Sequence, residues 1–135
     1  MLKKTITYTD FNGQTRTEDF YFNLSKSEII LLETTTPGGY TAMLQRIVDW
    51  KDNIELMKAF TDLIKRSYGV KSEDGKRFVK SEQALEDFVN SAAFDEMFTE
   101  FFTSDTAAAD FAKGILPKDA MKGLPQDHKD SLTMA

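Results

Sequence analysis

The amino-acid sequence predicts an α+β fold in which an N-terminal β-hairpin precedes a small, mostly α-helical bundle. Residues 3–24 alternate apolar and polar positions around an Asn-Gly turn, which is the period of half-buried strands. Residues 26–113 instead repeat apolar side chains every three or four positions, between residues that begin or end helices. The periodicity stops after Pro117. We therefore expect a single globular domain over residues 1–117 and a flexible, disordered C-terminal tail over residues 118–135.

The hairpin is expected over residues 3–24, with its turn at residues 10–13, Asp-Phe-Asn-Gly. A two-residue Asn-Gly loop would place Ile6 opposite Asp19, which sets an apolar side chain against a charged one. A three-residue loop opened by a type I turn, with glycine left-handed at position 13, pairs Lys4 with Phe20 instead. We predict this second register because a slip of one residue would turn half of the apolar set to water. The apolar face then comprises Ile6, Tyr8, Phe20, Phe22 and Leu24.

Helices are expected to follow the hairpin. Ser25 and Glu28 match the capping-box pattern, and the next residues, 29–32, are all apolar, so this helix is either buried on several sides or partly a partner surface. Gly69 is expected to end the third helix in a left-handed cap, with Val70 folding back onto that helix. Gly114 is expected to lie just past the end of the last helix. The expected helices span about residues 26–34, 40–50, 53–68, 82–90, 92–102 and 105–113.

Composition narrows the function classes. The chain has no Cys, which excludes disulfides, thiol catalysis and thiolate metal sites and fits a reducing compartment, so a cytoplasmic protein is expected. Its formal charge of −5 argues against a nucleic-acid partner, because binding to phosphates needs a surface rich in Lys and Arg. No apolar run approaches the roughly 20 residues of a membrane span. The only His, His128, lies in the expected tail, so no catalytic, cofactor or metal site is predicted.

Charged clusters are expected to be solvated surface. Adjacent acidic pairs, such as Glu86-Asp87, point apart in a helix or strand and do not form a site. The basic residues between positions 71 and 80 are interleaved with acidic ones, which indicates charge balance within the chain more than contact with nucleic acid. These basic residues are Lys71, Lys76, Arg77 and Lys80.

An aromatic ridge is the main candidate for a binding surface. Its side chains follow helical spacing in the segment expected over residues 92–102. Such a stripe ordinarily packs into the core, here against the hairpin and the third helix. The alternative is a groove for an apolar partner helix, because Met and Phe adapt to different helical partners. The candidate partner-binding residues are Phe94, Met97, Phe98, Phe101 and Phe102.

Several segments together indicate a family. They are TITYTDFNG at residues 5–13, EDFYFNL at 18–24 and YGVKSEDGKRFVKS at 68–81, and the likeness continues at Phe111, Gly114, Ile115 and Pro117. The chain in this respect resembles the tail assembly chaperones of long-tailed, siphovirus-type bacteriophages. The resemblance implies a non-enzymatic protein in the host cell cytoplasm. Such a protein coats the long, largely helical tape measure protein while the tail tube polymerises, and is absent from the mature virion.

The resemblance also implies partners. The first is the tape measure protein. The others are a longer form of the chain made by ribosomal frameshifting, the tail tube protein and further copies of the chain. Pro117-Lys118 is compatible with a slippery heptamer in the DNA.

Two alternatives remain open at this point. A structural virion protein, such as a head–tail connector or tail subunit, would use the hairpin to extend a neighbour's sheet and would be present in purified particles. A small hydrolase would need a pocket of converging titratable groups.

Overall fold

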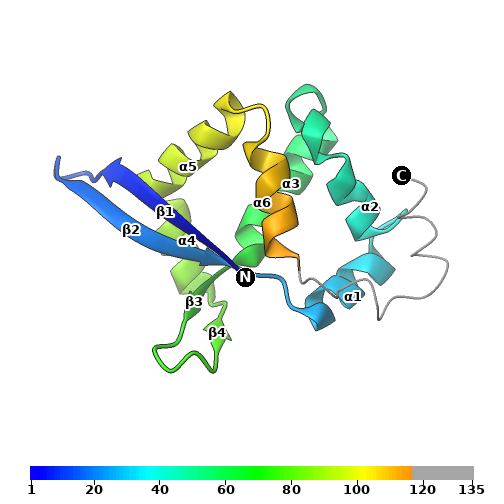
Figure 1. Ribbon diagram of the computed structural model, residues 1–135, viewed down its shortest axis with the longest axis horizontal. Helices are drawn as coiled ribbons and strands as arrows, with labels where there is room; N and C mark the ends of the chain where they lie inside the picture. Colours follow the sequence, from blue (N-terminus) through cyan, green and yellow to red (C-terminus); the bar gives the residue numbers. More distant parts are fainter. Residues whose placement is uncertain (117–135) are drawn as a thin grey trace.

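The structure, a computed structural model, describes residues 1–116. They form the predicted α+β fold, a long N-terminal hairpin followed by helices (Figure 1). Pro117 and the expected tail at residues 118–135, which contains His128, lie outside the described residues. Over residues 1–116, the helices are all too short or too polar to cross a lipid bilayer.

The predicted hairpin register is confirmed. Strands β1 (Leu2–Thr9) and β2 (Thr15–Phe22) pair antiparallel, with Lys4 opposite Phe20. The Gly13 N–H donates to the Asp10 carbonyl at 2.9 Å, and Gly13 has a φ of 82°, as the three-residue loop requires. The face of the hairpin that carries Ile6 and Phe22 is therefore turned to the core, where both side chains are buried.

Two further strands extend this sheet, and the sequence did not predict them. Strand β3 (Tyr68–Lys71) pairs with β2, and β4 (Phe78–Val79) pairs with β3, so the sheet order is β1-β2-β3-β4. The expected left-handed cap at Gly69 is wrong, because helix α3 (Ile54–Ser67) ends at Ser67, Tyr68 is already extended and Gly69 continues into β3. Val70 does not fold back onto the helix and is 48% exposed.

Most helices lie within two residues of their expected bounds, and the capping box of Ser25 and Glu28 is confirmed. The exception is the helix expected over residues 40–50, which is wrong. The chain forms a short α-helix and then tightens into a 3₁₀ helix, in which Ile47 and Trp50 both face the core because residues three apart eclipse each other. The helices are α1 (Lys26–Thr35), α2 (Tyr40–Gln45), η1 (Ile47–Asp52), α3 (Ile54–Ser67), α4 (Glu82–Val89), α5 (Ala92–Thr103) and α6 (Ala107–Ile115).

Helix α6 begins and ends two residues later than expected, so Gly114 lies inside it and not past its end. The Ser104 hydroxyl accepts a hydrogen bond from the Ala107 N–H at 3.2 Å, but residues 105 and 106 between them are not helical. Gly114 is placed against Leu2 of β1, whose Cδ1 would lie 3.1 Å from a Cβ atom at that position. The late helix α6 therefore packs on the first strand of the chain.

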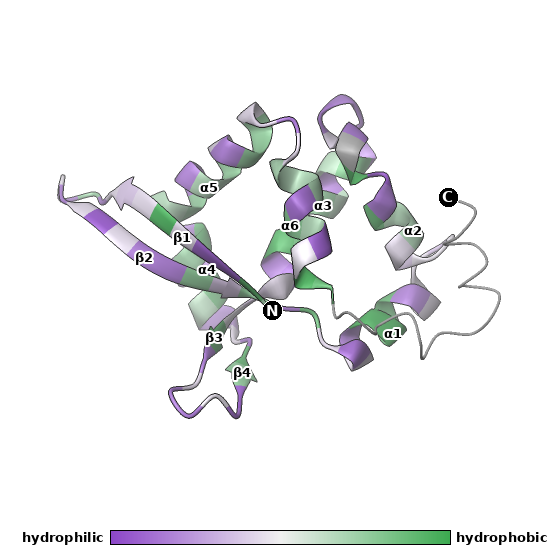
Figure 2. Ribbon diagram, viewed as in Figure 1, coloured by the Kyte–Doolittle hydropathy of each residue, from purple (hydrophilic) through white to green (hydrophobic). Residues whose placement is uncertain are grey.

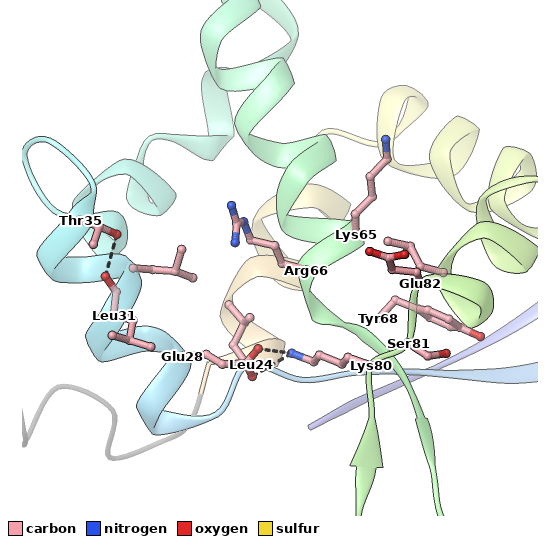
Figure 3. Close-up of a pocket in the computed structure, with 12 residues that line it drawn as sticks. Leu24, Glu28, Leu31, Thr35, Lys65, Arg66, Tyr68, Lys80, Ser81 and Glu82 are labelled. Atoms are coloured by element: carbon pink, nitrogen blue, oxygen red, sulfur yellow. Dashed lines mark hydrogen bonds and ion pairs between the residues drawn. The ribbon is translucent and has the colours of Figure 1, made fainter.

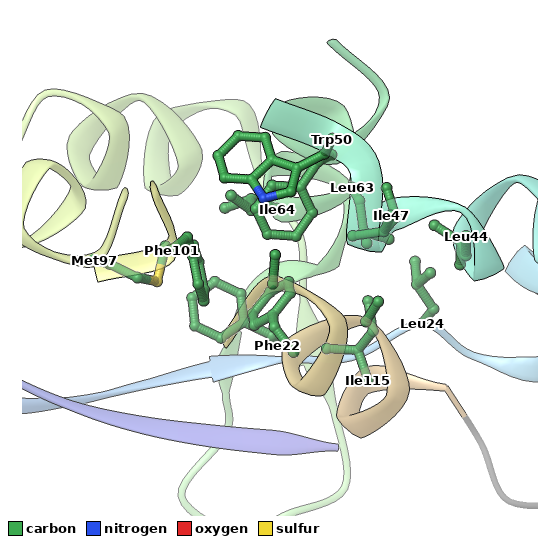
Figure 4. Packing of buried hydrophobic residues seen from close by; sticks show 14 of the residues in the cluster. Phe22, Leu24, Leu44, Ile47, Trp50, Leu63, Ile64, Met97, Phe101 and Ile115 are labelled. Atoms are coloured by element: carbon green, nitrogen blue, oxygen red, sulfur yellow. The ribbon is translucent and has the colours of Figure 1, made fainter. Parts of the chain in front are cut away.

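The core lies where α3, α5 and α6 meet the inner face of the hairpin (Figure 4). Phe22, Phe60, Phe101 and Phe111 are buried there, and their rings contact one another edge-on or tilted, for example Phe60 and Phe101 at 5.2 Å. The Trp50 ring contacts the Phe60 ring in a tilted arrangement, with centroids 4.7 Å apart. Helices α1 and α2 lie to one side of this core, at the end opposite the hairpin tip (Figure 1).

Candidate functional site

The five residues of the predicted ridge do not form one surface. Met97 and Phe101 are fully buried in the core, whereas Phe94 and Phe98 are half-buried and Phe102 is 48% exposed. Met97 and Phe101 thus form an inner stripe on α5, and Phe94, Phe98 and Phe102 form an outer stripe. Binding of a partner by this ridge stays a prediction, and in this structure only Phe94, Phe98 and Phe102 are accessible to one.

The outer stripe is continuous with a row of aromatic rings. Phe94 and Phe98 stack with centroids 6.0 Å apart, and Trp50 contacts Phe98 at 5.7 Å and Phe102 at 5.8 Å. Trp50 is buried and supports this row from behind. Because the rings hold one another in place, the exposed edges of the row form a fixed apolar surface.

A groove runs between α3 and α5 beside this row, which we call the α3–α5 groove. It consists of two adjoining hollows of about 560 and 440 Å³ that share Thr61, Lys65 and Phe98. Met57 from α3, Val89 from the end of α4 and Phe94 from α5 add apolar walls. The predicted residues Phe94 and Phe98 are therefore brought together in a surface groove, as a helix-binding site requires.

A second groove lies on the other side of Lys65, between α1, the end of α3 and the start of α4 (Figure 3). We call it the α1 groove. Its volume is about 500 Å³. Its lining combines apolar side chains from several elements with charged side chains on its rim. The apolar side chains are those of Leu24, Leu31, Leu32, Tyr68 and Leu85, and the charged ones are those of Glu28, Lys65, Arg66, Lys80 and Glu82.

Helix α1 exposes much of its apolar surface. Ile29 is fully buried, but Ile30 is 38% and Leu31 is 64% exposed. Figure 2 shows this strongly hydrophobic stretch on a helix at the edge of the molecule. Of the two interpretations of this helix, burial on several sides is excluded, since only one side packs on the core. Of the accessible apolar side chains of this helix, Leu31 and Leu32 form one wall of the α1 groove.

An ion pair closes one end of the α1 groove. Lys80 donates to both carboxylate oxygens of Glu28, at 2.7 and 2.8 Å, and to the Asn23 carbonyl at 2.8 Å. Burial raises the pKa of Glu28, but the hydrogen bonds from Lys80 and from the Ser25 N–H outweigh it, so the pKa is lowered overall. This pair joins α1 to the segment between β4 and α4 and fixes the width of the groove (Figure 3).

The other two cations of the rim differ in their pairing. Arg66 is held by Asp62 at 2.5 Å, one turn earlier in α3. Lys65 makes no ion pair or hydrogen bond within residues 1–116, and it lines both grooves. Its ammonium group is free to bind an acidic partner at either groove.

The acidic pairs in the sequence, unlike the two grooves, do not come together to form a binding site. Over the part of the chain that the structure describes, His, Asp and Glu side chains form no group of three or more that could hold a metal ion. Sequence reasoning did not find the α1 groove, because residues from several distant segments build it. The apolar run at residues 29–32 was the only signal that pointed to it.

Comparison with known proteins places this chain among viral assembly factors. A family model described as phage tail assembly chaperone matches residues 1–132. The match covers every residue that the structure describes, including both grooves and the hairpin. Searches of curated proteins and of solved structures found no match.

Proposed function

The chain belongs to the phage tail assembly chaperones, and we propose that it binds the tape measure protein and keeps it soluble while the tail tube assembles. One observation supports this proposal most directly. Phe94 and Phe98 of the outer stripe line a surface groove, and the neighbouring Phe102 is 48% exposed. Contiguous apolar surface of this kind marks an interaction site.

The tape measure protein needs such a chaperone because it is long and largely helical. A long helix with an apolar face aggregates unless that face is covered, and a chaperone that binds reversibly covers it by mass action. The outer stripe repeats every four residues, which matches the spacing of apolar anchors on a partner helix lying along α5. We propose that the tape measure helix lies in the α3–α5 groove, with acidic residues near Lys65.

This function requires no chemistry on the partner. We propose a non-enzymatic role in the host cell cytoplasm, with release before the particle is finished. A frameshifted longer form of the chain and the tail tube protein are proposed as further partners, since both would meet the tape measure protein at the growing tube.

Co-expression with an apolar tape measure fragment tests this proposal. Wild-type protein is expected to keep the fragment in the soluble fraction. Thr61→Arg, which fills the groove without removing any core side chain, is expected to abolish this, as is Phe98→Asp. Ile54→Asp is the matched control, because Ile54 is 71% exposed and lines neither groove.

Thermal melting followed by near-ultraviolet circular dichroism establishes that each variant is folded. A fragment that stays insoluble with wild-type protein present would remove the main support for the proposal, and so would full activity of folded Thr61→Arg. Purified particles provide a second test by mass spectrometry. The chain is expected to be absent from them, whereas many copies per particle would indicate a structural virion protein.

A further inference from the structure

Strand β1 has no neighbouring strand on one of its two sides. The sheet order is β1-β2-β3-β4, so β1 is an edge strand, and it is eight residues long. Natural proteins protect such an edge with a proline, a bulge or a very short strand, because an open edge can pair with another extended chain. Strand β1 has none of these features, since residues 2–9 contain no proline and pair one to one with β2.

The turn of the hairpin determines which backbone groups of β1 point outward. The Asp10 N–H donates to the Gln14 carbonyl at 2.8 Å, so these two residues form a hydrogen-bonded pair of the ladder. Such pairs alternate along antiparallel strands, which directs the N–H and C=O groups of the even-numbered residues of β1 toward β2. Those of the odd-numbered residues, among them Thr5 and Thr7, point away from β2. Within residues 1–116 these outward groups have no hydrogen-bond partner.

Two adjoining hollows follow this edge, on the side of β1 where α5 and α6 lie (Figure 1). We call them together the edge groove. Their volumes are about 520 and 350 Å³, and they share Thr5 and Glu100. Residues 2–7 of β1 all line the edge groove, although their side chains alternate between the two faces of the sheet. The backbone edge of β1 therefore faces this groove.

The helical wall of the edge groove is acidic. Glu96 and Glu100 lie one turn apart on α5, and Asp110 of α6 adds a third carboxylate. Glu100 is already paired with Lys4 at 3.0 Å. Lys3 lies next to Lys4 in the strand, so its side chain belongs to the opposite face of the sheet. The carboxylates of Glu96 and Asp110 have no ion pair or hydrogen bond within residues 1–116, and they favour a basic occupant.

We propose that the edge groove binds an extended, basic segment of another protein, which pairs antiparallel with β1 as an added strand. The antiparallel direction continues that of the sheet, in which β1, β2, β3 and β4 pair antiparallel in turn. Alternate side chains of the added strand then face α5, where Lys or Arg meets Glu96 and Asp110. Apart from Thr99, no residue of the edge groove lines the α3–α5 groove or the α1 groove, so this contact does not depend on binding of the tape measure protein.

A fluorescein-labelled peptide of the sequence Thr-Lys-Thr-Lys-Thr-Lys-Thr tests this contact by fluorescence anisotropy with the full chain. The peptide is expected to bind, because its alternation places every lysine on one side of an extended strand. A peptide of the same composition, Lys-Lys-Lys-Thr-Thr-Thr-Thr, is expected to bind at least about tenfold more weakly.

Backbone methylation of the peptide tests the strand pairing itself. In the antiparallel arrangement the N–H groups of the threonines point toward β1, and those of the lysines point away from it. N-methylation of the threonines is therefore expected to abolish binding, whereas N-methylation of the lysines is expected to leave it unchanged. Equal effects of the two modifications would contradict strand addition.

Thr7→Pro blocks the edge on the side of the protein. The proline ring replaces the outward N–H at position 7 and leaves the β1–β2 ladder intact, because that N–H does not bond to β2. Thr17→Pro is the matched control. Thr17 lies directly opposite Thr7, its N–H also points away from the ladder, and both variants lose the 3.0 Å hydrogen bond between the two hydroxyls. Thr7→Pro is expected to weaken peptide binding by at least about tenfold, and Thr17→Pro is expected to bind like wild type.

Two neighbouring residues of α5 test the role of charge. Glu96→Gln is expected to weaken peptide binding about threefold and to reduce its dependence on salt, because one attraction between charges is lost. Asp95→Asn is the control, since Asp95 lines the α3–α5 groove and not the edge groove. Near-ultraviolet circular dichroism and thermal melting establish that each variant is folded.

Failure of the alternating peptide to bind wild-type protein would overturn the proposal, and so would unchanged binding by folded Thr7→Pro. Dimers of the chain alone that Thr7→Pro abolishes, together with no peptide binding, would assign the edge to a second copy and would also contradict it. Thr61→Arg is expected to bind the peptide while losing the tape measure fragment, and Thr7→Pro is expected to do the reverse. The two proposals therefore fail separately.

Discussion

Gly69 in β3 lies directly against the aromatic ring of Phe78 in β4. A Cβ atom at position 69 would lie 2.5 Å from Cε2 of Phe78, which is shorter than any real carbon contact. Phe78 is half-buried, and its ring covers the backbone of β3. The absence of a side chain at Gly69 therefore allows the short β3–β4 hairpin to close.

Gly69→Ala is expected to lower the free energy of unfolding by about 1 to 3 kcal/mol, the usual cost of forcing an extra methyl group into a packed site. Urea denaturation measures it. In a Phe78→Ala background the same change is expected to cost less, because the ring is gone.

Gly114→Ala is the matched control for this prediction. Its Cβ would meet only the flexible end of Leu2 at 3.1 Å, and alanine favours the helix, so stability is expected to stay equal or rise. Equal losses at positions 69 and 114 would contradict this account of Gly69.

Phe101→Ala and Phe102→Ala are expected to differ sharply although the residues are neighbours. Phe101 is fully buried between Phe60 and Phe111, so its truncation is expected to cost about 3 to 5 kcal/mol. Phe102 is 48% exposed, and its truncation is expected to cost under about 1 kcal/mol. Similar losses in chemical denaturation would show that the division of the ridge by α5 is wrong.

Tyr40→Phe is expected to leave stability unchanged or to raise it. The Tyr40 hydroxyl is buried and has no hydrogen-bond partner among the described residues, and burial raises its pKa strongly. A buried hydroxyl without a partner costs about 1 to 3 kcal/mol, which the Phe variant avoids. A lower melting temperature for Tyr40→Phe would indicate that the hydroxyl is hydrogen-bonded in solution.

The Glu28–Lys80 pair predicts a small loss of stability in acid. Because the folded-state pKa of Glu28 is lowered, its contribution is complete above the ordinary glutamate pKa of about 4.3 and is lost as the pH falls through the folded-state value. The two side chains are 25% and 37% exposed, so solvent screening keeps the contribution under about 1 kcal/mol.

Lys80→Met is therefore expected to lose stability relative to wild type at neutral pH and to match it in acid, below the folded-state pKa of Glu28. Urea denaturation at both pH values measures the difference. Lys58→Met is the control, since Lys58 has no ion pair within residues 1–116. A Lys80→Met deficit that persists in acid would assign its cause to lost packing and not to charge.

The hairpin could be predicted from the sequence in detail because local signals agree there. The alternation of Ile6 and Phe20 fixes the face, and the Asp10-to-Gly13 turn fixes the register, so each supports the other. Caps at Ser25 and Ser81 are equally local, since each side chain accepts from a backbone N–H three residues ahead.

The β3–β4 hairpin could not be predicted because its signals are short and ambiguous. Gly69 after a helical stripe has the pattern of a C-terminal cap, and the contact that explains it comes from Phe78, nine residues away. A strand of two residues, Phe78–Val79, has no periodicity that a sequence pattern could detect.

The helical spacing of the ridge predicts one surface, but the ridge is wider than one face of a helix. From Met97 to Phe102 the side chains turn through about 140° of the helix, more than one packed face covers. The core contacts one margin of this arc, at Met97 and Phe101, and leaves Phe102 to solvent. Which margin is buried depends on where the hairpin and α3 lie, and no local signal gives that position.

The first strand of the protein is held by its last described helices. Lys4 pairs with Glu100 of α5 at 3.0 Å, and Leu2 lies against Gly114 of α6. During synthesis the apolar face of the hairpin is therefore covered completely only after α5 and α6 have left the ribosome. A nascent chain stalled before residue 100 lacks Phe101 and Phe111, so that face is covered only in part, where Tyr68 and Phe88 contact Phe22.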